Sequence, residues 1–368
     1  MTLKIKNNSK ILINILKYIK PMELAHTEAE NTIKKPSRNL GIEMLRMFLC
    51  FRIVFLHYCS PKNKIIKSLK RNRFQVSCFF FISFYFLFPI ISNRDNKKLK
   101  IRLERLLIPY IIYPFVIWII NDLMFLLIKF NRYNRLLTLN DLKKQLIIGR
   151  GIYGISILWF HFNLILFTIF FSITSFILQN YFLTIFQTLA LITYILQYTQ
   201  INYLYFIQYT ENIWMSVGNL VETFPIAIIA FSISNIYIKP VLLKNRKKFF
   251  FFSIFLFFII SNYDIFSNIK GFSSNGIKHI FTSLFLFISF SIIPFDILNS
   301  KILVIINQIT RYTQGIYCLH FLFQYYLKLK FDKEGTFIGC IFLYIISYFV
   351  SLIGFKIFSQ TKLKFLFS

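Results

Sequence analysis

Acidic residues are scarce in this sequence, because 14 Asp and Glu stand against 43 Lys and Arg, for a formal net charge of +29. So large a positive charge is common in proteins that bind nucleic acid. Here, however, the basic residues gather in clusters between apolar runs, which is the pattern of loops that join membrane helices. The charge therefore predicts contact with membrane lipid and excludes nucleic acid as the partner.

Cysteine is also scarce, and the five cysteines never form a C-x-x-C pair. They are Cys50, Cys59, Cys78, Cys318 and Cys340. An odd number inside mostly apolar stretches excludes a disulfide framework, and their spacing excludes a zinc site. We expect them to act as small apolar side chains, and we expect no metal.

Long polar segments are few, since 56% of the residues are hydrophobic and 48 are Phe. This composition excludes an ordinary soluble domain. It predicts an all-α polytopic transmembrane bundle of about ten spans within residues 39–358. The predicted spans are 39–60, 74–92, 106–130, 155–178, 181–200, 214–238, 249–262, 278–297, 312–327 and 335–358. We expect Pro109 and Pro114 to kink the third span, and residues 131–154 to form an interfacial helix or an ordered loop.

The two ends of the sequence are predicted to be cytoplasmic tails, 1–38 and 359–368. Met1–Lys20 scatters lysines among Ile and Leu without a secretory pattern, and it is typical of an amphipathic helix on the membrane that ends at Pro21. The segments that share a side with these tails hold more Lys and Arg than the opposite loops, which favours a cytoplasmic location for both ends. These segments are 93–105, 239–248 and 298–311.

The first predicted span is apolar but carries four ionisable side chains, Glu43, Arg46, Arg52 and His57. Eleven residues make about three turns of an α-helix, so Arg46 and His57 share one face roughly 16 Å apart. Glu43 lies on the same face, three residues before Arg46, where the two side chains can pair. Arg52 points away from that face.

Each ionisable group near the centre of a bilayer costs about 2.5 to 3.5 kcal/mol, so a helix that carries several of them usually lines a polar interior. For Arg52 the alternative is that its guanidinium simply reaches the headgroups. For Arg46 and His57 the shared face favours a common function. With three turns between them, we expect no direct contact.

A second candidate group follows in the basic loop 93–105, where Arg102 and Arg105 are three residues apart. On a helix this spacing places both guanidinium groups on one side. Guanidinium groups bind phosphates well because they offer several donors in a fixed fork. The alternative is that the loop is only a positive-inside signal.

Several motifs in this chain occur together in one known family. They are GIEMLR and LHY in the first span, CFFFIS in the second, RLERLLIPY at the entry to the third, LWF at 158–160 and TQGIYCLH at 313–320. Together they resemble the acyltransferase 3 family of integral membrane enzymes. The most specific parts are the ten-residue interval between Arg46 and His57 and the pair Arg102 and Arg105.

The resemblance implies that an acyl group, commonly acetyl, moves from cytoplasmic acyl-CoA to a hydroxyl of a surface or lipid-linked glycan. By this likeness His57 and Arg46 are the catalytic pair, and Arg102 and Arg105 recognise acyl-CoA. Glu43, Ser83 and His320 are possible supporting residues. Acyl-CoA is a donor substrate and not a permanently bound cofactor, and the default location is a bacterial plasma membrane.

Two positions depart from the family pattern. Phe84 stands where the family usually has Gly after the serine, and Glu43 stands where Asp is common. Phe84 puts a close approach of two helices at this point in doubt. It also leaves open the alternative that the protein is an inactive member of the family.

The roles of the histidines have more than one interpretation in the sequence. His57 is suited to act as a general base or to carry the acyl group itself. His161 and His320 line an acceptor path or are hydrogen-bonded structural residues. A transporter or flippase for a glycan or lipid intermediate is the rival function, and the oligomeric state is undetermined.

Overall fold

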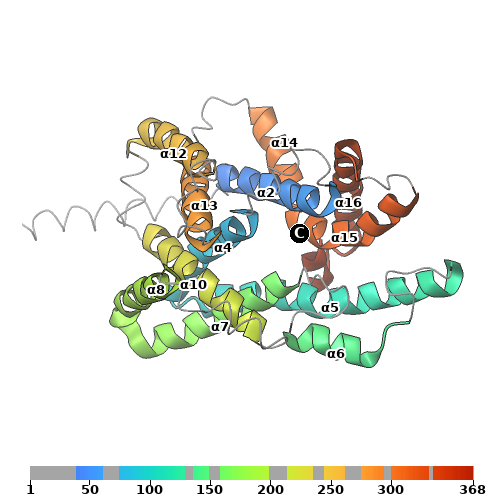
Figure 1. The fold of residues 1–368 in the computed structure, drawn as a ribbon, viewed down its shortest axis with the longest axis horizontal. Coiled ribbons are helices and arrows are strands. Elements are labelled where there is room, and N and C mark those ends of the chain that lie inside the picture. The colour runs from blue at the N-terminus through green and yellow to red at the C-terminus, as the bar shows by residue number, and fades with distance from the viewer. Residues whose placement is uncertain are drawn as a thin grey trace, which may run out of the picture. The chain divides into compact units, whose positions relative to one another are not determined.

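The structure is a computed structural model, and it describes residues 39–60, 74–128, 136–148, 158–198, 214–234, 244–261, 275–293, 300–330 and 335–367. Within these ranges every regular element is helical (Figure 1). The elements are α2 (Leu40–Tyr58), α4 (Phe74–Ser92), α5 (Asn96–Ile128), α6 (Leu139–Ile148), α7 (Trp159–Leu178), η1 (Gln179–Tyr181), α8 (Phe182–Tyr198), α10 (Trp214–Ser234), α12 (Arg246–Ser261), α13 (Asn275–Ser291), α14 (Ser300–Thr310), α15 (Thr313–Lys330), α16 (Phe337–Ile357) and η4 (Lys362–Leu366). The predicted amphipathic tail lies outside the described residues.

Four helical segments in the described ranges are long and apolar enough to cross a membrane. They are Phe74–Ser92, Asn96–Ile120, Trp159–Ile192 and Phe337–Ile357. The predicted count of about ten spans is therefore not confirmed. Helix α2 has the length of a span, but it carries three charged side chains, Glu43, Arg46 and Arg52, and it is not among these four.

Helix α2 lies beside α15 and α16, two helices from the far end of the chain (Figure 1). The Cys50 Sγ donates to the backbone oxygen of Thr313 at 3.4 Å, at the start of α15, and His57 meets Phe321 two turns further along α15. The residue numbers of both partners increase from the first contact to the second, so α2 and α15 are parallel. Helix α16 is antiparallel to α2, because the Phe55 ring lies 6.2 Å from that of Phe337 at the start of α16.

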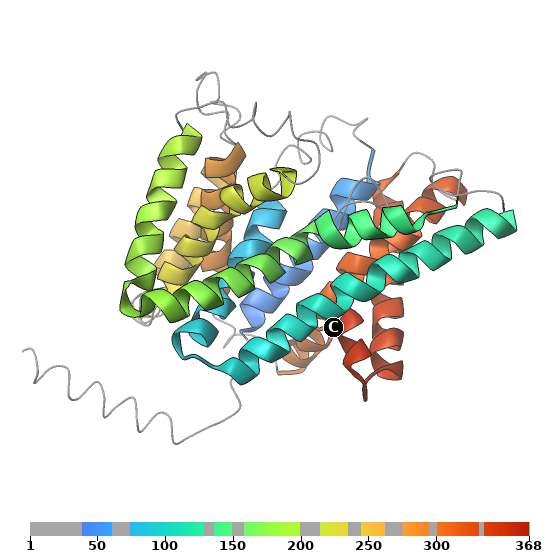
Figure 2. The ribbon, with the colours of Figure 1, turned by 90° about the horizontal axis from the view of Figure 1, so that it is seen from below.

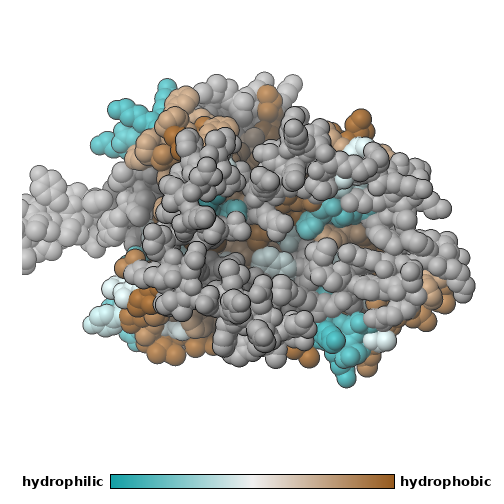
Figure 3. All heavy atoms as spheres, viewed as in Figure 1, coloured by the Kyte–Doolittle hydropathy of each residue, from teal (hydrophilic) through white to brown (hydrophobic). Residues whose placement is uncertain are grey.

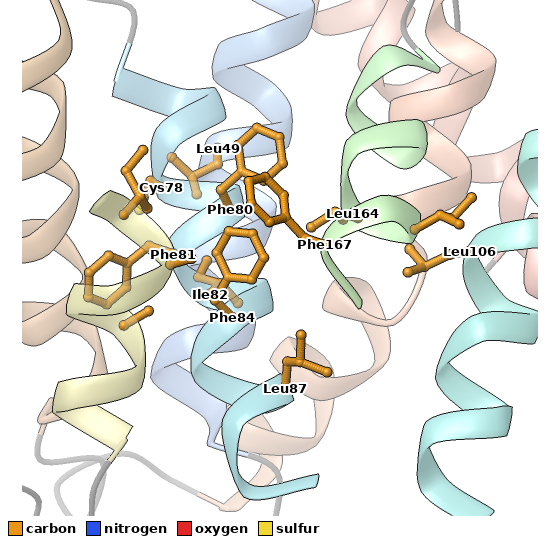
Figure 4. Close-up of a cluster of buried hydrophobic side chains, with 14 of the residues drawn as sticks. Leu49, Cys78, Phe80, Phe81, Ile82, Phe84, Leu87, Leu106, Leu164 and Phe167 are labelled. Carbon is orange, nitrogen blue, oxygen red and sulfur yellow. The ribbon is translucent and has the colours of Figure 1, made fainter. Parts of the chain in front are cut away.

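Helix α4 packs against α7, α10 and α13, and its phenylalanines form much of the core (Figure 4). Two weakly polar contacts cross its boundary with α13. The Ser283 hydroxyl donates to the Phe74 oxygen at 3.3 Å, and Cys78 Sγ donates to the Ser283 oxygen at 3.8 Å. All five cysteines are free and buried, as expected for small apolar side chains.

Two predicted loops are helical instead. Helix α5 begins at Asn96, inside the predicted basic loop, and continues through Pro109 and Pro114 as one helix beside α7 (Figure 2). Asp95 explains the early start, because its carboxylate accepts from the Lys98 backbone N–H at 3.0 Å in the manner of a helix cap. The hydrogen bond and ion pair with Lys98 also lower the pKa of this carboxyl group. Likewise, α14 occupies most of the predicted loop 298–311.

Helices α7 and α8 follow each other directly through the short η1, and the Phe170 and Phe186 rings near this corner lie 5.7 Å apart. One further prediction agrees with the structure. Helix α6 is the expected helix between the third and fourth predicted spans. Its first turn is capped by Thr138, whose hydroxyl accepts from the Asp141 backbone N–H at 3.3 Å.

Apolar side chains remain exposed on the outside of several helices, as in a protein whose outer surface meets lipid. Phe176 is 72% exposed on α7 and Ile338 is 79% exposed on α16. On the face shown in Figure 3, hydrophilic groups gather over the start of α12 and over α6, whereas brown apolar groups cover α7 and α8.

The C-terminal segment that contains η4 is anchored to the start of α5. Lys362 Nζ lies 2.7 Å from Glu104 Oε1, and the Tyr113 hydroxyl donates to the Leu366 oxygen. Phe367 then reaches α15 and α16 at two glycines, Gly315 and Gly354. The segments 93–105 and 356–368 therefore share one side of the protein, as the loop charges predict.

Gly315→Ala tests the seating of this segment. An added Cβ would lie 2.9 Å from the Phe367 Cα, a backbone atom that cannot move aside cheaply. We expect the free energy of unfolding in detergent to fall by about 1 to 3 kcal/mol.

Gly354→Ala is the matched control, because its nearest neighbours are atoms of the Phe367 ring. We expect a smaller loss there, since a ring can turn. Thermal unfolding of the two variants compares them, and an undiminished stability of Gly315→Ala would contradict the tight seating.

Candidate functional site

The N-terminal half of α2 holds an ion pair. Arg46 Nη1 lies 3.1 Å from Glu43 Oε2 and 3.3 Å from Oε1, as the three-residue spacing predicts. The Glu43 side chain is 12% exposed and that of Arg46 is 31% exposed. Glu43 also lies in the first turn, where a carboxylate is favoured by the helix dipole. The pair leaves a partly exposed guanidinium near the start of the helix.

Arg52 lies on another side of α2 and is buried. Its guanidinium carbon is 5.5 Å from the centre of the Phe55 ring and 5.8 Å from that of Phe74. These are cation–π distances. Arg52 therefore packs between α2 and the start of α4, away from Arg46 as predicted, and its side chain does not extend to the surface.

The last turn of α2 places His57 against α15. The His57 ring lies 4.8 Å from that of Phe321 and 5.9 Å from that of His320. Gln324 secures the turn, because its Nε2 donates to the His57 backbone oxygen at 2.9 Å. His57 is half-buried. Arg46 and His57 thus meet different partners, in agreement with their separation along the helix.

His320 is fully buried, and its ring orientation is set by its own helix. The Nδ1 atom lies 3.2 Å from the Ile316 backbone oxygen. A carbonyl oxygen only accepts, so Nδ1 donates, and in the neutral ring Nε2 then holds a lone pair. Tyr317 lies beside it on α15, with ring centres 6.2 Å apart. His161 of α7 follows at 6.0 Å from Tyr317.

The two predicted phosphate ligands have different neighbours in the structure. Arg102 Nη2 donates to the Ser83 hydroxyl at 2.6 Å and to the Ser83 backbone oxygen at 3.1 Å. Arg102 therefore ties α5 to α4. Arg105 is exposed, and its guanidinium carbon lies 5.3 Å from the centre of the Phe365 ring in η4.

Phe84 fills the core next to Ser83, at the position where the family pattern has glycine. Its ring lies 5.2 Å from Phe167, 5.9 Å from Phe171 and 6.1 Å from Phe231, and it is fully buried (Figure 4). The aromatic side chains of α7 and α10 thus accommodate the larger residue. The contact of Ser83 with Arg102 is kept.

The sequence left His161 and His320 open between an acceptor path and structural roles. It gave His320 as a possible supporting residue and did not include His161 in the site. The available signal was the Tyr-x-x-His spacing of Tyr317 and His320, which places both on one face of a helix. No comparable spacing in the sequence indicated that His161 of α7 would lie beside these residues. Among the described residues, no group of three or more His, Cys, Asp or Glu side chains is arranged to hold a metal ion.

These observations define an integral membrane protein in which arginine and histidine side chains lie among apolar helices. A family model described as an acyltransferase domain, that of the acyltransferase 3 family, matches residues 39–358. The chain belongs to this family and is a membrane acyltransferase by class. No curated protein and no solved structure matches the chain.

The contact between Arg102 and Ser83 predicts the effect of Arg102→Lys. Lysine offers a single flexible ammonium and does not reproduce the guanidinium fork. We expect a loss of about 1.5 to 3 kcal/mol in the free energy of unfolding, as for a hydrogen bond to a charged group. Arg105→Lys is the control on the same helix, with an expected change within about 0.5 kcal/mol because Arg105 is exposed. Equal melting temperatures for both variants would contradict the tie between α4 and α5.

Proposed function

We propose that this protein transfers an acyl group, acetyl, from cytoplasmic acyl-CoA to a hydroxyl of a surface or lipid-linked glycan. Membership of the acyltransferase 3 family over residues 39–358 carries the proposal. The position of His57 supports it, because the imidazole lies where the end of α2 meets the buried rings of α15. The rival function, transport without acyl transfer, lacks this support.

In the proposed reaction the acceptor oxygen attacks the thioester carbonyl carbon while His57 takes the hydroxyl proton. The carbon–sulfur bond then breaks, and the thiolate of CoA receives the proton from the imidazolium. A covalent acyl-His57 intermediate is the alternative. Arg46, held by Glu43, supplies positive charge at the other end of α2.

We place the donor end of the reaction at the side of the protein where α5 begins. Arg105 is exposed there, and Arg102 lies one turn before it. Charged guanidinium groups suit the phosphates of acyl-CoA. The Glu104–Lys362 ion pair joins this region to the C-terminal segment. In our proposal this side is cytoplasmic, both termini lie on it, about ten helices cross the membrane, and the membrane is a bacterial plasma membrane.

His57→Ala tests the chemistry. We expect acyl transfer to fall at least about a hundredfold, the lower end of the usual contribution of a general base. The measurement is the content of alkali-labile acyl esters in the surface glycan, with membrane levels of the protein quantified in parallel.

His279→Ala is the matched control, since His279 lies on α13 outside the rings around His57. The surface glycan of cells that carry His279→Ala should keep a normal content of acyl esters. Near-normal acylation by His57→Ala would contradict the proposed role.

Arg105→Met tests recognition of the donor. We expect the dissociation constant for acetyl-CoA to rise by about three- to tenfold, as for the loss of one charge-assisted contact, and further when Arg102 is replaced as well. Calorimetry on the purified protein measures it. Lys98→Met, an exposed change near the start of the same helix, is the control. Unchanged affinity in the double variant would contradict the assignment of both arginines.

A further inference from the structure

Three histidines from three helices and one tyrosine form a chain of neighbouring rings that begins at the proposed catalytic residue, His57. His57 of α2 lies 5.9 Å from His320, His320 lies 6.2 Å from Tyr317, and Tyr317 lies 6.0 Å from His161. These distances join ring centres. The proposed chemistry uses only His57, so His161 and His320 need an explanation of their own.

Both additional histidines carry a buried ring nitrogen that finds no hydrogen-bond partner within the described part of the chain. These atoms are His161 Nδ1 and His320 Nε2. The side chains are well within the interior, at 3% exposure for His161 and 0% for His320. Leaving a buried polar atom without a hydrogen bond is costly, so two such atoms near the proposed catalytic residue indicate that another molecule supplies their partners.

Several further neighbours of this cluster are aromatic. Phe79 and Phe160 lie 6.2 Å and 5.9 Å from Tyr317, and Phe321 lies 4.7 Å from His320. Small-molecule sites are typically apolar and aromatic, with a few convergent polar groups that orient the ligand. Imidazole nitrogens among aromatic rings suit an uncharged ligand that has both hydroxyl groups and apolar C–H surfaces. A sugar ring has this combination.

We propose that His161 and His320 bind hydroxyl groups of the acceptor, and that this acceptor is a neutral sugar with more than one hydroxyl. The Nδ1 atom of His161 and the Nε2 atom of His320 make the contacts, while His57 meets the hydroxyl that is acylated. This inference rests on the proposed function and adds the acceptor side to it.

The experiment exchanges each histidine for the two amides that resemble it. The amide of Asn occupies the place of Nδ1, whereas the amide of Gln reaches the place of Nε2. His161→Asn should therefore keep the contact and His161→Gln should lose it. At position 320 the order is reversed, because His320→Asn preserves only the donor to the Ile316 oxygen.

The assay uses radiolabelled acetyl-CoA as the donor and, as the acceptor probe, surface glycan of the producing cells stripped of its esters by mild alkali. For His161→Gln and His320→Asn we expect the KM for glycan to rise about three- to tenfold, the effect of one lost hydrogen bond. The KM for acetyl-CoA should stay within about twofold of the original value. The control His279→Gln should change neither constant by more than this. His161→Asn and His320→Gln should raise the KM for glycan less than the other amide at the same position does.

Acetyl-CoA binding reports the folded fraction of every variant, so a folding defect is separated from a weaker acceptor contact. If His161 and His320 have a purely structural role, the Asn and Gln variants at each position should both contain less active protein, and the KM for glycan should stay unchanged. If that result is obtained and the unsubstituted protein is active, this inference is overturned and the proposed function stands. An original protein that consumes no acetyl-CoA with glycan would instead overturn the proposed function.

Discussion

The structure depends on one constraint, which is that polar side chains in an apolar helical interior must find partners within the protein or in a ligand. Ser and Thr side chains of the helices meet it locally by donating to the backbone one turn earlier, as Thr168 does to Leu164 and Ser351 does to Ser347. Arg102 meets it across helices, through both oxygens of Ser83. Among the buried polar atoms for which neither solution is found are one ring nitrogen each of His161 and His320, and the site for the acceptor is proposed there.

The same constraint separates two regions with different chemistry. At the beginning of α5, cationic side chains lie near the C-terminal segment, and Arg105 is exposed there. At the far end of α2, the neighbours of His57 are imidazole and phenyl rings. In our proposal, a charged donor and an uncharged acceptor bind at these two different regions. Arg46 lies on α2 between these environments, held by Glu43.

Phe84 illustrates how packing absorbs a departure from a family pattern. A glycine at this position would permit a close helix approach, whereas here a phenyl ring fills the space between α4, α7 and α10. The neighbouring serine still accepts from Arg102. The residue that differs thus has a structural explanation that leaves the adjacent polar contact intact.

The sequence by itself determined the all-helical membrane class, the family, and those contacts that repeat along one helix, such as Glu43 with Arg46. Helical periodicity makes such neighbours visible, because residues three or four apart share a face. It did not reveal that the loop before the third span is helical from Asn96, where the Asp95 cap outweighs the local charge. Nor did it separate the roles of Arg102 and Arg105.

Only the tertiary structure decided which helices supply the remaining side chains of the site. Cys50 meets Thr313 across 263 residues of sequence, and this parallel docking of α2 on α15 is what brings His57 to His320. His161 joins them because α7 brings its ring to within 6.0 Å of that of Tyr317. Contacts of this kind depend on how apolar faces fit together in space, and the spacing of residues along one chain does not encode that fit in any local pattern.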